Sequence, residues 1–167
     1  MREKLTKGDV AKIEAELEHR KLVIRKEAAA AIAEAAAQGD RSENFEYHAA
    51  KKYRGENESR IRYLENVLKT AIVISDESAP DEVGLNNTVV LFDQEEEEEE
   101  TYRVVTSMRG NLLHNQISIE SPLGKALLRH KVGDVVTVHV NDGYSYQVEI
   151  RQIIKENDES GDRIRSF

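Results

Sequence analysis

The chain has 167 residues, 34% of them charged and 39% hydrophobic, which is enough for one ordinary domain or two small ones. The absence of cysteine excludes disulfide bridges and cysteine-based metal sites. A formal net charge of −8 argues against nonspecific nucleic-acid binding, because an acidic surface gains little from counterion release. The chain begins without the apolar core of a signal peptide and has no apolar run long enough to span a bilayer, so we expect a cytoplasmic protein.

Residues 6 to 71 have helical periodicity that is broken once. Thr6 followed by Asp9 resembles a capping box and predicts where the first helix begins. Two apolar stripes follow with heptad-like spacing, which is typical of helices that pack along their length. Their members are Val10, Ile13, Leu17, Ile24 and Ala31 in the first stripe and Tyr47, Ala50, Ile61, Leu64, Leu68 and Ala71 in the second.

The two stripes match when one helix is folded back antiparallel on the other, with Leu17 facing Leu64, for example. This register places the reversal between residues 40 and 41, where Gly39 can stop one helix and Asp40 can start the next. We therefore predict a coiled-coil hairpin over residues 1–74. One continuous helix in an intermolecular coiled coil is the alternative, and Gly39 and the matched register argue against it.

Four polar residues fall on or near the predicted seam: Arg20, Glu27, Arg54 and Asn57. The same register sets Glu27 opposite Arg54, a pair of opposite charges. We interpret all four as residues that fix the register of the hairpin, a known use of polar seam positions.

Residues 75–82 are polar and contain a proline, as is typical of a linker, and the periodicity then changes to that of strands. We expect a globular α+β domain over residues 83–155, with an antiparallel sheet, one short helix started by Ser121 and Pro122, and a mobile tail over 156–167. The acidic run 95–100 is interpreted as a solvated hairpin loop without a function. The strands are predicted at 88–92, 102–106, 116–119, 135–140 and 144–150.

Two motifs carry a resemblance to a known family. The predicted tip reads Gly-Asp-Arg-Ser-Glu-Asn-Phe-Glu-Tyr-His-Ala-Ala from Gly39, and residues 118–128 read Ser-Ile-Glu-Ser-Pro-Leu-Gly-Lys-Ala-Leu-Leu, followed by Gly133-Asp134. Both resemble the signatures of the Gre transcript-cleavage factors, over roughly residues 5–154. The acidic charge and modest basic patch resemble the GreA branch more than the GreB branch.

The resemblance implies a coiled-coil hairpin followed by an FKBP-like domain, acting as a monomer in complex with RNA polymerase. In that family the hairpin enters the secondary channel, and two tip acids share Mg²⁺ with the polymerase active centre to stimulate cleavage of backtracked RNA. By motif these acids are Asp40 and Glu43, which makes the protein an accessory factor and not itself an enzyme. It would meet DNA only through the polymerase.

Further roles are implied at matching positions. Lys51 is a candidate for contact with the nascent RNA 3′ end, and Asn44, Phe45 and Tyr47 are candidates for supporting the tip. Ser121 and Pro122 are candidates for docking on the polymerase. Phe45 departs from the family pattern, which has a small residue there, and this leaves the cleavage preference open.

Each reading has a competitor. Asp40 and Glu43, three apart at a predicted helix start, also have the spacing of a capping box. At the level of function, the alternatives are a Gre-like channel-binding regulator without cleavage activity, a prolyl isomerase and a coiled-coil assembly protein. Cleavage is favoured because both acids are present, and isomerase activity is disfavoured because fold analogy alone cannot carry an activity.

Overall fold

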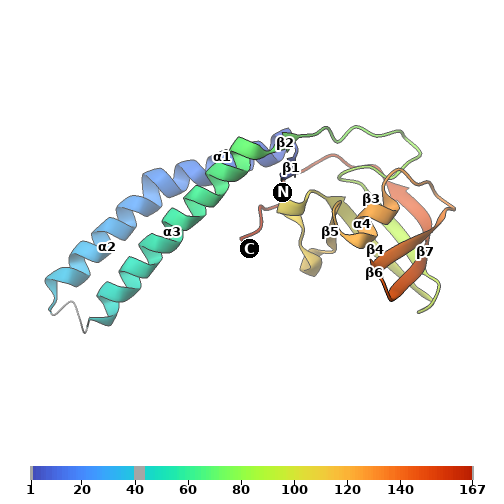
Figure 1. Ribbon diagram of the computed structural model, residues 1–167. Helices are drawn as coiled ribbons and strands as arrows, with labels where there is room; N and C mark the ends of the chain where they lie inside the picture. Colours follow the sequence, from blue (N-terminus) through green and yellow to red (C-terminus); the bar gives the residue numbers. More distant parts are fainter. Residues whose placement is uncertain (1, 40–43, 167) are drawn as a thin grey trace. The chain divides into compact units, whose positions relative to one another are not determined.

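The computed structural model describes residues 2–39 and 44–166, which form two compact units. The first unit is built mainly from Val10–Ala71, and the second combines Glu3–Asp9 with the chain from Ile72 onward (Figure 1). The predicted hairpin domain is thus present, but its first residues and the predicted linker belong to the second unit. No helix in the described part of the chain has the length and apolar character needed to cross a membrane.

The first unit is an antiparallel helical hairpin. Its first arm consists of α1 (Lys7–His19), the π-helix η1 (Arg20–Ile24) and α2 (Arg25–Ala37). The second arm is the single helix α3 (Phe45–Thr70), which packs beside α2 (Figure 1). The helical hairpin predicted from the two matched stripes is confirmed.

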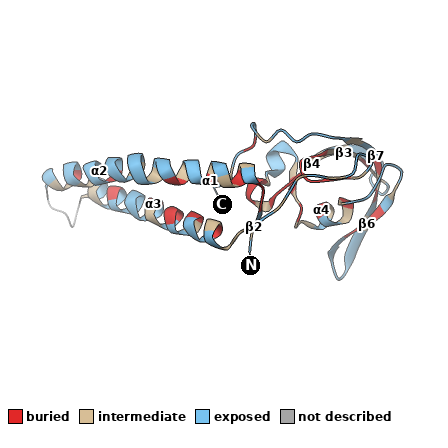
Figure 2. Ribbon diagram, turned by 90° about the horizontal axis from the view of Figure 1, so that it is seen from above, coloured by how far each residue is buried: buried red, intermediate tan, exposed pale blue. Residues whose placement is uncertain are grey.

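Burial along the hairpin follows the predicted stripes up to η1. Ile13 and Leu17 are buried on α1, and buried residues recur along α3 (Figure 2). Those on α3 are Ala50, Asn57, Arg60, Ile61, Leu64 and Val67.

Beyond η1 the predicted stripe on the first arm is wrong by one residue. Ala31 is exposed, whereas Ala28 and Ala35 are buried. A π-helical turn accommodates one residue more than an α-helical turn, so it advances the buried face by one position. The predicted position of Glu27 on the seam is wrong for the same reason, and its expected pairing with Arg54 is not observed. Both side chains are exposed, and Arg25 instead bonds Glu58 across the arms at 3.0 Å.

A polar cluster crosses the seam beside η1. Arg20 donates from Nη1 to Asn57 Oδ1 at 2.9 Å, and Asn57 Nδ2 donates to the Arg20 carbonyl at 3.3 Å. Glu16 accepts from Arg20 Nε at 2.7 Å and from Arg60 Nε at 2.9 Å. Arg20 and Asn57 thus lie on the seam as predicted, and they join Glu16 and Arg60, which the sequence pattern did not single out.

The second unit contains a five-stranded sheet in the order β5-β4-β3-β7-β6. Its strands are β3 (Thr88–Asp93), β4 (Glu98–Val105), β5 (Gln116–Ser118), β6 (Val135–Asn141) and β7 (Tyr144–Ile154). All five predicted strands are present. The sheet is mixed, not purely antiparallel as predicted, because β5 pairs parallel to β4. The acidic run is also only partly a loop, since its second half belongs to β4.

The core of this unit is formed by apolar side chains from the sheet and from helix α4 (Pro122–Leu127). Its buried members are Val83, Leu85, Val89, Leu91, Val104, Ile117, Ile119, Leu127, Val136, Val138, Val148 and Ile150.

The beginning of the chain is built into the second unit. Thr6 N donates to Asp9 Oδ2 at 3.0 Å and Asp9 N donates to Thr6 Oγ1 at 3.1 Å, which confirms the predicted capping box. Just before it, β1 (Lys4–Leu5) pairs parallel with β2 (Ile72–Val73).

The segment predicted as a linker is hydrogen-bonded to the globular unit. Lys155 Nζ donates to Ser78 Oγ at 2.6 Å and to the carbonyls of Ala79 and Glu82, each at 2.9 Å. Asn86 Nδ2 donates to Asp76 Oδ2 at 3.1 Å. These bonds join residues 76–82 to the globular unit, although their polar composition is typical of a linker.

The prediction of a mobile tail is wrong for residues up to Arg165. Asp162 is buried and accepts from Arg103, Arg109 and Gln116. Arg165 N donates to the Met108 carbonyl at 2.8 Å. Polarity alone suggested a solvated tail, whereas buried arginines in the domain provide partners for its carboxylates.

Candidate functional site: the hairpin tip and the second motif

Helix α2 ends before the tip of the hairpin, and helix α3 begins after it. Gln38 is the C-cap of α2, and Gly39 follows with φ of 149°, a backbone conformation that residues with a Cβ rarely adopt. On the other side, α3 begins at Phe45 with Asn44 as its N-cap. The predicted catalytic and metal-binding residues, Asp40 and Glu43, lie outside the described residues.

Asn44 joins the two arms. Its Oδ1 accepts from Tyr47 N at 3.1 Å, which satisfies a backbone donor in the first turn of α3. Its Nδ2 donates at 2.6 Å to the Ala35 carbonyl in the last turn of α2, which also accepts from Gln38 N at 3.2 Å. The suggestion that Asp40 starts the second helix is wrong, because Asn44 occupies the N-cap position.

The other candidates near the tip differ in exposure. Phe45 is 90% exposed at the first position of α3, so it contributes almost nothing to the packing of the hairpin. Tyr47 is half-buried, and its ring centroid lies 5.7 Å from that of His48. Phe45 therefore presents an exposed aromatic ring at the start of α3, whereas Tyr47 is half-buried on the same helix.

Lys51 is exposed on α3, with Nζ 5.4 Å from the centroid of the Tyr47 ring. This distance suits a cation–π contact, which leaves the ammonium able to attract phosphate. The neighbouring Lys52 lies 3.9 Å from Glu56 one turn further on. The basic stretch behind the tip is therefore partly neutralised within α3 itself.

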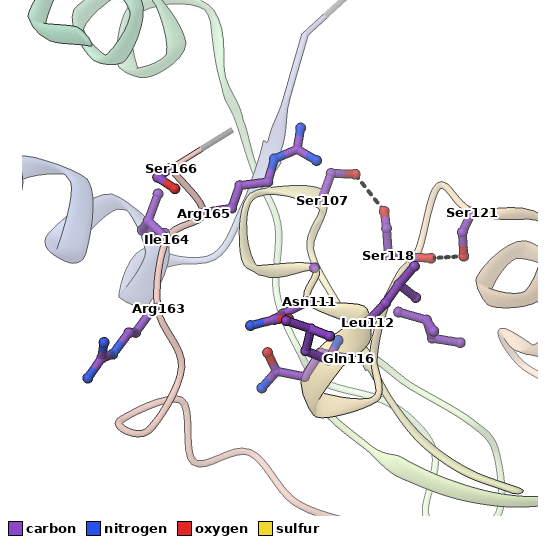
Figure 3. A pocket seen from close by; sticks show the side chains of 13 residues that line it. Ser107, Asn111, Leu112, Gln116, Ser118, Ser121, Arg163, Ile164, Arg165 and Ser166 are labelled. Atoms are coloured by element: carbon purple, nitrogen blue, oxygen red, sulfur yellow. Dashed lines mark hydrogen bonds between the residues drawn. The ribbon is translucent and has the colours of Figure 1, made fainter. Parts of the chain in front are cut away.

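In the second motif, Ser121 and Pro122 begin helix α4. Ser121 Oγ donates to the Ser118 carbonyl at 2.6 Å (Figure 3). It also accepts from Gly124 N at 3.1 Å. A Cβ on Gly124 would lie 2.0 Å from the Ser118 carbonyl oxygen, so only glycine fits there. These contacts explain structurally why serine and glycine occur in the Ser-Pro-Leu-Gly part of the motif. Pro122 itself is exposed at the surface.

One buried charge was missed by the sequence reasoning. Arg109 is fully buried and forms ion pairs with Asp9 at 2.5 Å, Asp162 at 2.7 Å and Glu159 at 3.2 Å. Its Nη1 also donates to Asn86 Oδ1 at 2.8 Å. Nothing local marks Arg109 in the sequence, because the three carboxylates that pair with it lie about 50 to 100 positions away.

Two further observations bear on the chemistry. Burial, together with the hydrogen bond to Glu100 at 3.0 Å, raises the pKa of Tyr102 to about 12, so this phenol stays protonated at neutral pH. Among the residues that the structure describes, His, Asp and Glu side chains form no group of three or more suited to a metal ion.

Comparisons with known proteins agree with the two-part architecture. The family model described as "Transcription elongation factor, N-terminal" matches residues 3–73, and "Transcription elongation factor, GreA/GreB, C-term" matches residues 76–155. The transcription elongation factor GreA of Thermoanaerobacter pseudethanolicus is 46% identical over 140 residues, covering 83% of this chain and 89% of the relative. GreA of Macrococcus caseolyticus is 40% identical over 149 residues, covering 89% and 94%.

Among solved structures, the GreA factor homolog 1 protein of Thermus thermophilus aligns at 29% identity with a TM-score of 0.42. The alignment covers 93% of this chain and all of that one. Both family models together span nearly the whole chain, in the order of its two units. The chain belongs to the GreA/GreB family of transcription elongation factors.

Proposed function

We propose that this elongation factor binds RNA polymerase through the secondary channel and stimulates Mg²⁺-dependent cleavage of backtracked RNA. The hairpin carries Asp40 and Glu43 to the polymerase active centre, and removal of the extruded 3′ end rescues an arrested complex. The protein is then an accessory factor that stimulates an activity of the polymerase.

The capping of α3 carries this proposal. If Asp40 and Glu43 capped the second helix, capping alone would explain why acidic residues occupy these two positions. That position is taken by Asn44, which bonds Tyr47 N at 3.1 Å and the Ala35 carbonyl at 2.6 Å. The two acids are therefore not required as the N-cap of α3, and the exposed Phe45 contributes little to packing of the hairpin.

The donor set fits magnesium. Mg²⁺ prefers oxygen ligands and is often held by one or two protein carboxylates, with water and phosphate oxygens completing its shell. Asp40 and Glu43 offer two carboxylates, which suits an ion shared with the polymerase. When bound, the ion would polarise the scissile phosphodiester and lower the pKa of a water molecule. The chain itself would hold and orient that ion at the end of a rigid hairpin.

The proposal gives Lys51 and the second motif supporting roles. Lys51 lies seven residues after the N-cap of α3, about 10 Å along the helix, where its exposed ammonium can attract a phosphate of the extruded RNA. Ser121 shapes the turn through its bonds to Ser118 and Gly124, and Pro122 presents a surface for docking on the polymerase.

The test uses bacterial RNA polymerase stalled in a backtracked complex, with labelled RNA and Mg²⁺. We expect the wild-type chain to accelerate cleavage, and Asp40→Asn and Glu43→Gln to abolish the acceleration while still competing with it for polymerase. Glu34→Gln is the matched control, because Glu34 is an exposed carboxylate near the end of α2. Polymerase binding without acceleration by the wild-type chain would contradict the cleavage proposal and favour a non-cleaving channel regulator.

A further inference from the structure

The chain continues beyond its family match and folds back onto the second unit. The C-terminal family model ends at residue 155, and the following segment, residues 156–166, is called the extension below. Asp162 holds it in place, with a side chain that is 2% exposed and lies 2.7 Å from Nη1 of both Arg103 and Arg109. Gln116 Nε2 donates to the same carboxylate at 2.7 Å.

Neighbouring residues of the extension are bonded as well. Glu159 accepts from Thr6 Oγ1 at 2.6 Å, and the Asp158 carbonyl accepts from Arg103 Nη2 at 2.6 Å. Two of the three carboxylates around the fully buried Arg109 therefore come from the extension. Loss of these partners would leave a buried guanidinium uncompensated, which is strongly destabilising.

Once seated, the extension forms one wall of a groove of about 870 Å³. Arg163, Ile164 and Arg165 lie on one side, and Leu112, Ser118 and Ser121 lie on the other (Figure 3). The groove therefore runs beside the second motif, and four of the thirteen residues that line it, residues 163–166, lie outside the family match.

The opposite wall displays two leucines on a rigid turn. Leu112 is 77% exposed and Leu113 is 94% exposed. Asn111 Oδ1 accepts from Leu113 N at 3.1 Å, and Asn111 and Gln116 exchange two backbone hydrogen bonds of 2.9 Å. Adjacent exposed apolar side chains on an ordered turn are typical of an interaction site.

The charge of the groove differs from that of the protein. The chain carries a net charge of −8, yet the charged residues among the described lining are Arg163 and Arg165, both exposed. An apolar groove with a cationic wall complements a segment that carries both acidic and apolar side chains. We propose that the extension and the Leu112-Leu113 turn together bind such an acidic, apolar segment of RNA polymerase. The choice of partner rests on the function proposed above.

The test measures binding of the full-length chain to purified RNA polymerase. Leu113→Ser removes an apolar contact and Arg165→Glu reverses a charge, and each should weaken binding by about tenfold. Asp162→Asn lies outside the groove and should also weaken binding, by releasing the wall. Hydrogen exchange of residues 158–165 should increase in this variant. Added salt should weaken binding of the wild type more than that of Arg165→Glu.

The matched controls are Val132→Ser, Arg129→Glu and Asp142→Asn, because each is an exposed residue of the same unit outside the groove lining. Binding of Leu113→Ser, Arg165→Glu and Asp162→Asn at wild-type strength would overturn the inference even if cleavage is stimulated. Polymerase binding that depends on the groove, without stimulated cleavage, would support the inference and contradict the cleavage proposal. A wild-type chain that does not bind polymerase would overturn both.

Discussion

Asn44 and Ala35 connect the two arms of the hairpin at its tip, through a hydrogen bond of 2.6 Å from Nδ2 to the carbonyl oxygen. The same side chain caps α3 through Tyr47 N. The side chain of one residue therefore binds a backbone donor at the start of α3 and a backbone acceptor at the end of α2.

Asn44→Ala is expected to destabilise the hairpin by about 1–2 kcal/mol, because it removes the N-cap and the bond between the arms. The measurement is urea unfolding followed by circular dichroism. Asn66→Ala is the control, because Asn66 is solvent-exposed and lies away from the N-terminal end of α3. This substitution should change the free energy of unfolding by no more than about 0.5 kcal/mol. Equal midpoints for Asn44→Ala and wild type would show that the tip does not depend on this residue.

Because η1 is a π-helix, we expect the hairpin to tolerate deletion of one residue from this segment. Removal of Leu22, which is 56% exposed, should convert η1 to ordinary α-helix and leave Ala28 and Ala35 on the seam, so thermal stability should change little. Removal of Ala30 from α2 should turn every later residue away from α3 and cost more than about 2 kcal/mol. Similar losses from both deletions would contradict the proposed role of η1 in shifting the seam.

The cluster around Glu16 predicts a dependence on pH. Burial by itself raises the pKa of Glu16, but hydrogen bonds and charges from Arg60 and Arg20 outweigh it and hold this pKa below its ordinary value of 4.5. A carboxyl group whose pKa is lowered in the folded state stabilises that state above its unfolded pKa. The contribution is lost as pH falls through the folded pKa.

Unfolding midpoints measured between about pH 6 and pH 3 test this dependence. The wild-type chain should lose more stability over that range than Glu16→Gln, which has no carboxyl group to protonate at this position. Glu18→Gln, an exposed position on the same helix, should follow the wild type. Parallel curves for wild type and Glu16→Gln would exclude the stabilising role of this carboxylate.

Two glycines predict opposite effects of the same substitution. A Cβ on Gly124 would lie 2.0 Å from the Ser118 carbonyl oxygen, whereas a Cβ on Gly55 would meet nothing within 4 Å. Gly124→Ala should therefore destabilise the second unit by about 1–3 kcal/mol. Gly55→Ala should stabilise α3 by about 1 kcal/mol, because alanine loses less backbone entropy in a helix. The measurement is the thermal unfolding midpoint of each variant relative to the wild type, which should fall for Gly124→Ala and rise for Gly55→Ala.

The local pattern of the sequence was sufficient for much of the fold. Apolar spacing indicated the two helical arms and all five strands, and Thr6 with Asp9 indicated the first helix start correctly. These features depend on neighbours a few residues apart. Asp40 and Glu43 were singled out by motif, and their roles stay a prediction.

The tertiary structure alone decided what depends on distant partners. The π-helix η1 shifts the buried face of α2 by one residue, and the buried Arg109 forms ion pairs with Asp9, Glu159 and Asp162. Asp162 likewise holds a segment whose composition predicts a mobile tail. Periodicity indicates which face of its own helix or strand each residue occupies. A buried ion pair is formed by residues that only the folded chain brings together.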